Sequence, residues 1–122
     1  MTEGTERRQR VIVVEDDVDI AVLLTDILEA EGYAAVAVGD VPALESELVR
    51  RPDLVVLDLR LARGGPDSIL RSLRAREMDD VPILLLSAAN DLPERARELG
   101  VAKYLAKPFE LDEFLVIVRD MV

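Results

Sequence analysis

The chain has 122 residues with 15 basic and 25 acidic side chains, a formal charge of −10, and neither cysteine nor histidine. This composition excludes disulfides, thiolate metal sites, cysteine nucleophiles and a Ser-His-Asp triad, and it argues against a nucleic-acid-binding surface, which needs clustered Lys and Arg. Half of the residues are hydrophobic, which is enough to form the core of one domain. Any site must therefore use carboxylates, hydroxyls, Lys and Arg, and only hard cations with oxygen ligands would fit it.

Three short, uninterrupted apolar runs predict the strands of a sheet. They lie at 11–14, 54–57 and 83–86, and their length and β-branched residues are typical of parallel strands that are buried on both faces. Two weaker candidates lie at 34–38 and 103–106.

Helical patterns occupy the intervals between these runs. Apolar residues recur at helical spacing over 20–28 and stop before Gly32, at a position where a left-handed residue is favoured. A second helix is expected over 41–50, because Asp40 can cap it and Pro42 is tolerated in a first turn.

The second half of the chain continues the alternation. A third helix is expected over 65–76. A fourth helix is expected to begin at the capping-box pair Asp91 and Glu94 and to end at Gly100. A fifth apolar helical face covers 111–118. Strict alternation of strands and helices predicts an α/β fold, a parallel sheet wound with helices on both faces.

One domain accounts for nearly the whole chain. We expect a flexible N-terminal segment over 1–9 and a domain over 10–122. No segment reaches the roughly 18 apolar residues of a membrane span, and the start does not resemble a signal peptide. A cytoplasmic protein without a membrane partner is the expectation.

Polar side chains follow the predicted strands, at the edge where open parallel sheets bind ligands. They are Glu15, Asp16 and Asp17, then Asp58, Ser87 and Lys107. Clustered carboxylates are unfavourable unless a proton or a cation relieves them, and Mg²⁺ is the fitting cation. A Lys ammonium and a Ser hydroxyl suit a phosphoryl group. Together these groups are suited to phosphoryl transfer to an aspartate, with Asp58 as the nucleophile.

Each residue taken alone also has a structural interpretation. Glu15 to Asp17 could be a solvated loop or a helix cap, Asp58 a turn residue, Ser87 a loop hydroxyl and Lys107 a surface cation. Their common position at the strand ends favours the functional interpretation.

Four stretches of the sequence resemble the response-regulator receiver domains of two-component signalling. They are VIVVEDD at 11–17, LVVLDL at 54–59, LLLSA at 84–88 and KYLAKPF at 103–109. Their order and spacing match over essentially everything from Arg10 onward. The resemblance implies a flavodoxin-like sheet with strand order 2-1-3-4-5 and five helices.

The resemblance also implies a role for each site residue. Asp58 would accept a phosphoryl group from the phosphohistidine of a histidine kinase or a histidine phosphotransfer protein, while Ser87 and Lys107 would hold that group. Mg²⁺ would be bound by Asp16 directly, Glu15 through water, Asp58 and the backbone carbonyl of Arg60. Asp17 would point away, toward the first helix. The Lys107–Pro108 bond would be cis.

Activation in this family involves a switch. Ser87 and Tyr104 would shift an interaction surface formed by the fourth helix, the fifth strand and the fifth helix, and so control a downstream output protein or a fused effector. Tyr104 has a second interpretation, as a residue of the core or its rim. The domain would not contact nucleic acid itself and would catalyse only its own phosphorylation and dephosphorylation.

Val116 and Ile117 lie off the main apolar face of the last helix, so either a homodimer contact or neighbouring elements would cover them.

Two departures from the family pattern leave the reacting groups intact. Ala62 and Pro66 stand where the family often has Pro and Gly, and Arg60 places a long cation beside the phosphorylation site. Arg60 and Ala89 occupy the positions at which such families tune dephosphorylation. The alternatives are a pseudo-receiver that only binds partners and, less favoured, a phosphatase with an aspartate nucleophile. The phosphatase pattern has a second Asp where this chain has Arg60.

Overall fold

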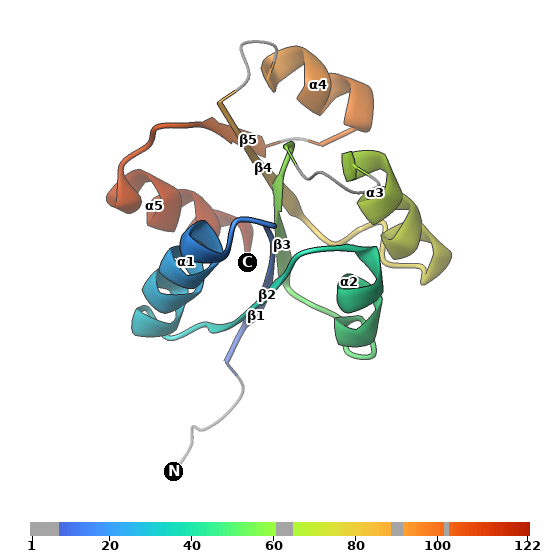
Figure 1. Ribbon diagram of the computed structural model, residues 1–122, viewed down its shortest axis with the longest axis horizontal. Helices are drawn as coiled ribbons and strands as arrows, with labels where there is room; N and C mark the ends of the chain where they lie inside the picture. The colour runs from blue at the N-terminus through green and yellow to red at the C-terminus, as the bar shows by residue number, and fades with distance from the viewer. Residues whose placement is uncertain (1–7, 61–64, 89–91, 102) are drawn as a thin grey trace.

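A computed structural model describes residues 8–60, 65–88, 92–101 and 103–122 of the chain. The described residues form one parallel sheet in the order β2-β1-β3-β4-β5 (Figure 1). Its strands are β1 (Arg10–Val14), β2 (Ala34–Val38), β3 (Leu54–Asp58), β4 (Ile83–Ser87) and β5 (Lys103–Ala106). The predicted α/β class and the 2-1-3-4-5 order are confirmed.

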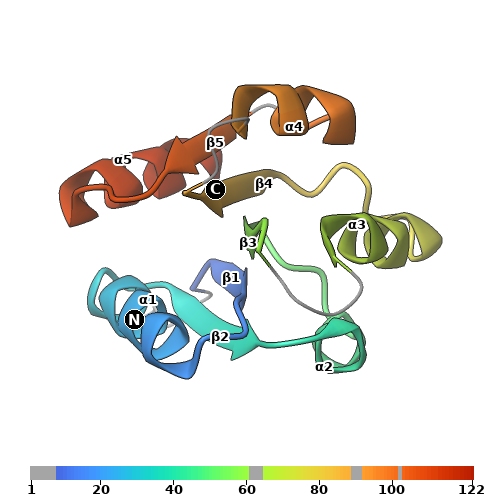
Figure 2. The same ribbon diagram turned by 45° about the horizontal axis from the view of Figure 1, so that its top comes forward.

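Five helices cover the two faces of this sheet among the described residues. They are α1 (Val18–Ala30), α2 (Val41–Glu47), α3 (Gly65–Ala75), α4 (Leu92–Leu99) and α5 (Leu111–Met121). Helices α1 and α5 lie on one face, and α2, α3 and α4 on the other (Figures 1 and 2). None of the described helices is long and apolar enough to cross a membrane.

The core has two halves because successive strand side chains point to opposite faces. Val11 and Val13 of β1 pack with Phe114 beneath α1 and α5, whereas Ile12 and Val14 pack beneath the other three helices. Apolar residues on both faces explain why the strands appear in the sequence as uninterrupted runs.

Local signals set the ends of the first helix. The Asp17 carboxylate caps α1 by accepting from the backbone N–H groups of Asp19 and Ile20, at 3.0 and 3.2 Å. Gly32 follows the helix with φ +98°, a conformation in which a side chain is strained. Asp40 caps α2 in the same way, by accepting from Ala43 N–H at 2.9 Å. The Asp40 cap and the Gly32 turn agree with the sequence prediction, whereas a cap at Asp17 was only the structural alternative for that stretch.

Helix α2 ends at Glu47, three residues before the predicted end at Arg50. The Arg10 guanidinium, at the start of β1, donates to the carbonyl groups of Glu47 and Arg50 at 2.8 and 2.9 Å. Pro52 also disfavours helical backbone in the residue before it. A distant side chain thus binds the last carbonyl group of the helix and a second carbonyl group three residues beyond it.

Two sequence predictions at the chain ends have different outcomes. Arg8 and Gln9, within the segment expected to be flexible, contact Glu29 and Ala34, and the rest of 1–9 lies outside the described residues.

On α5, Ile117 is half-buried against the core of the α1 face, whereas Val116 is 44% exposed. Neighbouring elements thus cover one of the two apolar residues and leave the other open. The capping-box residue Asp91 is not among the described residues.

Candidate functional site

The polar residues predicted from the sequence lie at the carboxyl ends of three central strands and of β5. Asp58 and Ser87 are the last residues of β3 and β4, and Lys107 directly follows β5. Glu15 and Asp16 directly follow β1. The parallel register pairs Asp58 with Leu86 and Ser87 with Ala106, which places these strand ends at one level of the sheet. Residues far apart in the sequence thereby reach one edge.

Asp58 is the centre of this site. Its side chain is buried, with a residue exposure of 5%, and both carboxylate oxygens are engaged. Lys107 Nζ donates to Oδ2 at 2.8 Å, and the backbone N–H of Arg60 donates to Oδ1 at 2.9 Å. An ammonium group and a backbone dipole thus orient one carboxylate toward the cavity at the strand ends.

Glu15 is a second buried carboxylate beside Asp58. Its Oε2 accepts from the backbone N–H of Asp17 at 3.1 Å, so the turn that leads into α1 also fixes the Glu15 side chain. Its Oε1 lies 3.8 Å from Lys107 Nζ, too far for a hydrogen bond, and no donor among the described residues binds this buried oxygen. A proton shared with Asp58 or a bound cation would satisfy it.

The two carboxyl groups are held in different protonation states. Burial and the neighbouring Asp58 carboxylate raise the pKa of Glu15 to about 7. Burial opposes ionisation of Asp58 as well, but the neighbouring Glu15 side chain and the hydrogen bonds from Lys107 and the Arg60 backbone outweigh it, and the pKa of Asp58 is lowered. Of the two groups, Glu15 therefore keeps a proton to the higher pH, and Asp58 is the carboxyl group that ionises first.

A cavity of about 260 Å³ opens at these groups. Its walls contain the four residues predicted to hold a cation: Glu15, Asp16, Asp58 and Arg60. Within the described ranges, no three acidic side chains converge closely enough to enclose a metal on their own. Mg²⁺ does not require that, because it keeps several waters and uses one or two carboxylates. The partnerless Glu15 oxygen and the all-oxygen donor set fit such an ion.

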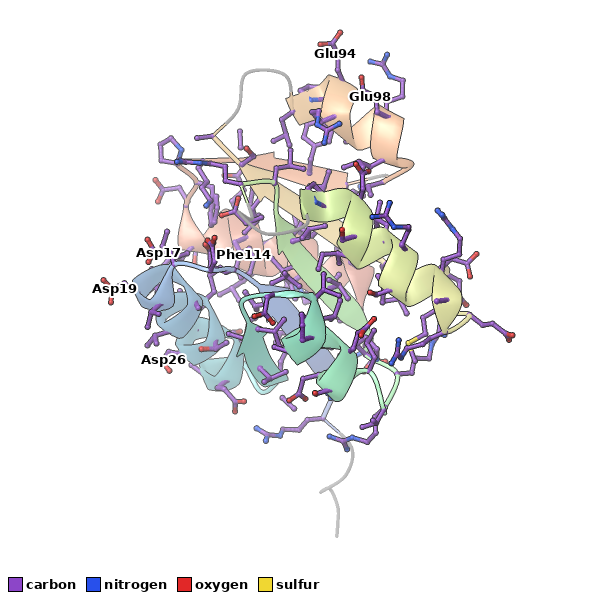
Figure 3. All side chains as sticks on the ribbon, turned by 45° about the vertical axis from the view of Figure 1, so that its right-hand side comes forward. Asp17, Asp19, Asp26, Glu94, Glu98 and Phe114 are labelled. Carbon is purple, nitrogen blue, oxygen red and sulfur yellow. The ribbon has the colours of Figure 1, made fainter. Side chains whose placement is uncertain are left out.

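Asp17 directs its carboxylate to the first turn of α1, as the resemblance implied, and the residue also lines the cavity. Its carboxylate caps α1, and Figure 3 shows it at the start of that helix, with Asp19 and Asp26 pointing outward further along. The same cavity is also lined by Ile20, which the sequence analysis assigned only to the apolar face of α1. Ile20 lies three residues after the capping residue Asp17, in the first turn of α1. This spacing could have placed Ile20 beside the strand ends.

The two residues assigned to the switch differ in burial. Ser87 is fully buried at the end of β4, and its carbonyl accepts from the N–H of Lys107 at 2.9 Å. Tyr104 on β5 is 43% exposed, which excludes a place in the core and leaves the rim and the switch as its two interpretations. The Lys107–Pro108 peptide bond is cis, as the resemblance implied. Ala62 and Ala89 lie outside the described residues.

Comparison with known proteins agrees with this geometry. The family described as the response regulator receiver domain matches residues 11–119, which is most of the chain. The chain belongs to this family. As a receiver domain it has the expected carboxylate cluster, lysine and hydroxyl at the expected strand ends.

Two curated relatives of this receiver domain come from Mycobacterium tuberculosis. The DNA-binding response regulator MtrA is 39% identical over 115 residues, which is 92% of this chain and 50% of MtrA. The transcriptional regulatory protein PrrA is 37% identical over 116 residues, which is 93% of this chain and 49% of PrrA. The receiver domain thus spans about half the length of the curated relatives it matches.

A solved structure gives the same fold at moderate identity. It is the receiver domain of the sensor histidine kinase PA1611 from Pseudomonas aeruginosa, with magnesium coordinated in its active site cleft. It superposes with a TM-score of 0.81 at 32% identity and covers 94% of this chain and 98% of that one.

Proposed function

We propose that this receiver domain accepts a phosphoryl group on Asp58 from a phosphohistidine of a partner protein. The observation that carries the proposal is the environment of Asp58: an ionised, buried carboxylate at a cavity, with Lys107 Nζ at 2.8 Å. These 122 residues contain no histidine, so the phosphohistidine is assigned to a histidine kinase or a histidine phosphotransfer protein.

The proposed transfer exchanges one bond for another. A carboxylate oxygen of Asp58 attacks phosphorus, the bond between phosphorus and the partner's imidazole nitrogen breaks, and the imidazole leaves with the bonding electron pair and takes up a proton. Lys107 counters the negative charge that gathers on the phosphoryl oxygens. Ser87, at the end of the next strand, is assigned to hold one of these oxygens through its hydroxyl group.

We assign Mg²⁺ to the same cavity. Asp16, Asp58 and the backbone carbonyl of Arg60 would hold it, with Glu15 acting through water, and the ion supplies positive charge that neutralises the phosphoryl oxygens. The partnerless Oε1 of Glu15 supports this assignment, because a buried carboxylate oxygen needs a proton or a cation. The magnesium named for the PA1611 receiver domain also supports it.

Phosphorylation is proposed to change a binding surface formed by α4, β5 and α5. Ser87 and Tyr104 would couple the site to this surface, with Tyr104 moving inward from its exposed position on β5. The recipient would be a downstream output protein or a fused effector, and the names of MtrA and PrrA favour an output in transcription. A homodimer through α5 is also proposed, with the exposed Val116 as a contact.

The chain is proposed to act on itself only. It would catalyse its own phosphorylation and dephosphorylation without turning over an external substrate, because Arg60 stands where an aspartate phosphatase of the alternative class would have a second Asp.

Intact-protein mass spectrometry with a small phosphodonor tests this proposal. In the presence of Mg²⁺ the wild-type protein should gain the mass of one phosphoryl group, and Asp58→Asn should gain none. Asp26→Asn is the matched control, because Asp26 is an exposed aspartate on α1 (Figure 3) and should leave modification unchanged.

The other outcomes of this experiment contradict the proposal in different ways. An unmodified wild-type protein that nevertheless binds partners would indicate a pseudo-receiver. Steady release of phosphate from simple phosphate esters would indicate a phosphatase. Modification that persists in Asp58→Asn would place the acceptor elsewhere.

A further inference from the structure

Strand β2 is one edge of the sheet in the part of the chain that the structure describes, and its own residues include none of those that usually protect an edge. It pairs with β1 only, and its sequence Ala-Ala-Val-Ala-Val contains neither a charge nor a proline. Exposed edges normally carry such residues, because their open N–H and C=O groups otherwise pair with another strand. The opposite edge, β5, does carry an exposed charge, Lys103. The two edges of one sheet therefore differ in how they are protected.

A side chain from α1 occupies the outer side of β2. Ala34 N–H donates to the Gln9 carbonyl at 2.9 Å, toward β1. Backbone N–H groups alternate in direction along a strand, so the next one, on Ala35, points away from the sheet. It donates to Glu29 Oε2 at 2.9 Å. The first outward donor of β2 is thus capped by a carboxylate.

The surroundings of Glu29 hold this carboxylate in place. Arg8 Nη1 binds the other oxygen, Oε1, at 3.1 Å, so the group is fixed between a guanidinium and the edge amide. The turn at Gly32 brings the end of α1 beside β2. The hydrogen bond from Ala35 and the neighbouring Arg8 also lower the pKa of Glu29, which keeps the acceptor charged at neutral pH. Its side chain is 44% exposed, so nothing buries the contact.

We propose that Glu29 is a removable cap on the β2 edge, and that an uncapped β2 pairs with the β2 of a second copy of this chain. Two copies related by a two-fold axis would present the same outward groups, those of Ala35 and Ala37, to each other in antiparallel register. The small, uncharged side chains of β2 place neither a bulky group nor a like charge opposite its own copy.

The first experiment compares Glu29→Ala with Glu29→Gln in sedimentation velocity over a range of protein concentrations. Glu29→Ala should associate about a hundredfold more tightly than the wild type, because each of the two copies no longer has a hydrogen-bond cap to displace, at about tenfold per cap. Glu29→Gln keeps an oxygen acceptor for Ala35 and should associate much less. The wild-type chain carries a charge of −10 and Glu29→Ala one negative charge fewer, so added salt should strengthen the association of Glu29→Ala by screening the repulsion between the two copies.

Amide hydrogen exchange at low protein concentration is the second measurement, and it does not depend on association. The Ala35 amide should exchange about tenfold faster in Glu29→Ala than in the wild type, with the amides of the buried strand β3 unchanged. Unchanged β3 protection also shows that the variant is folded. Equal Ala35 exchange rates in the two proteins would overturn the proposal.

A second-site change identifies the surface that associates. Ala37→Pro removes an outward N–H from β2, a substitution that edge strands tolerate, and should return Glu29→Ala to the wild-type assembly state. Association that survives Ala37→Pro would place the contact on another surface, such as α5, and would overturn the pairing of β2. Phosphorylation of Asp58 does not enter these measurements, so they can fail independently of the proposed function.

Discussion

At the scale of single residues, the site depends on a lysine that offsets two buried acids. Lys107 Nζ lies 2.8 Å from Asp58 and 3.8 Å from Glu15, and its own side chain is only 23% exposed. Removing one partner of a buried ion pair leaves the other charge uncompensated. The lysine therefore contributes to the stability of the fold as well as to the chemistry assigned to it.

We expect Lys107→Met to lower the free energy of unfolding at pH 7 by about 1–3 kcal/mol, because it leaves a buried carboxylate without its donor. Urea unfolding in metal-free buffer measures this change. The only other lysine of the chain, Lys103, is exposed on β5 and provides the matched control. Lys103→Met should stay within about 0.5 kcal/mol of the wild type. Equal losses in the two variants would mean that Lys107 does not offset the buried acids.

Glu15 gives the stability of the fold a dependence on pH. Its pKa is about 7 in the folded chain against 4.5 for the free side chain. Between these values the folded state retains a proton that the unfolded state has lost, so the free energy of unfolding falls as the pH rises. The expected decrease between pH 5 and 8 is about 1–3 kcal/mol, measured by urea unfolding with a chelator present.

Substitutions separate Glu15 from the other acids in this experiment. Glu15→Gln should flatten the decline, because the residue no longer titrates. Glu113→Gln, at an exposed position on α5, should retain the wild-type slope. A Glu15→Gln slope equal to that of the wild type would assign the pH dependence to other groups.

At the scale of elements, the end of α3 contains a strained residue. Glu77 follows the helix with φ +57°, the left-handed region that Gly adopts without cost. The turn is fixed by Met78 N–H, which donates to the Leu73 carbonyl at 2.8 Å, and by Glu77 N–H, which donates to the Arg74 carbonyl at 3.0 Å. This hydrogen-bond pattern is typical of a Schellman end.

Glu77→Gly should therefore raise the free energy of unfolding by about 0.5–1 kcal/mol, because it relieves the strained backbone. The same change inside a helix should have the opposite sign. Glu113→Gly in the first turn of α5 should cost about 1 kcal/mol, since Gly is a poor helix former and the change removes an acidic side chain that the helix N-terminus favours. Thermal or urea unfolding of both variants checks the pair of signs, and a loss of stability in Glu77→Gly would show that the Glu77 conformation is not strained.

At the scale of the whole molecule, the sequence was sufficient for the features that depend on burial. Apolar runs mark strands covered on both faces, and the polar residue that ends each run marks the site, because parallel strands bring their carboxyl ends to one edge. Asp58 and Lys107 were found in this way although 49 positions separate them.

Contacts between distant side chains could not be predicted from the sequence. The hydrogen bonding at the end of α2 depends on Arg10, the cover of the β2 edge on Glu29, and the position of Glu15 on the backbone N–H of Asp17. None of these contacts leaves a periodic pattern, because each joins one polar group to one backbone group. The partial cover of Ile117 likewise depends on how α5 packs against the sheet.

The net charge of −10 offers a test of whether the acidic cluster is a cation site or only part of an acidic surface. A general excess of negative charge is relieved by any salt, so MgCl₂ and NaCl of equal ionic strength would stabilise the fold equally. Binding of Mg²⁺ at a specific site raises the free energy of unfolding by an amount that depends on the ratio of the Mg²⁺ concentration to its dissociation constant. The increase is about 1.4 kcal/mol when the concentration is ten times the dissociation constant.

We therefore expect MgCl₂ to raise the free energy of unfolding more than NaCl of matched ionic strength does, and we expect Asp16→Asn to abolish the difference. Asp26→Asn, an equal loss of charge on the exposed side of α1, should preserve it. Both comparisons use urea unfolding at constant pH and need no phosphodonor, so they test the cation site separately from the phosphoryl chemistry. Equal stabilisation by the two salts in the wild type would contradict the proposed Mg²⁺ site. Protonation of Glu15 would then be the way in which its buried oxygen is satisfied.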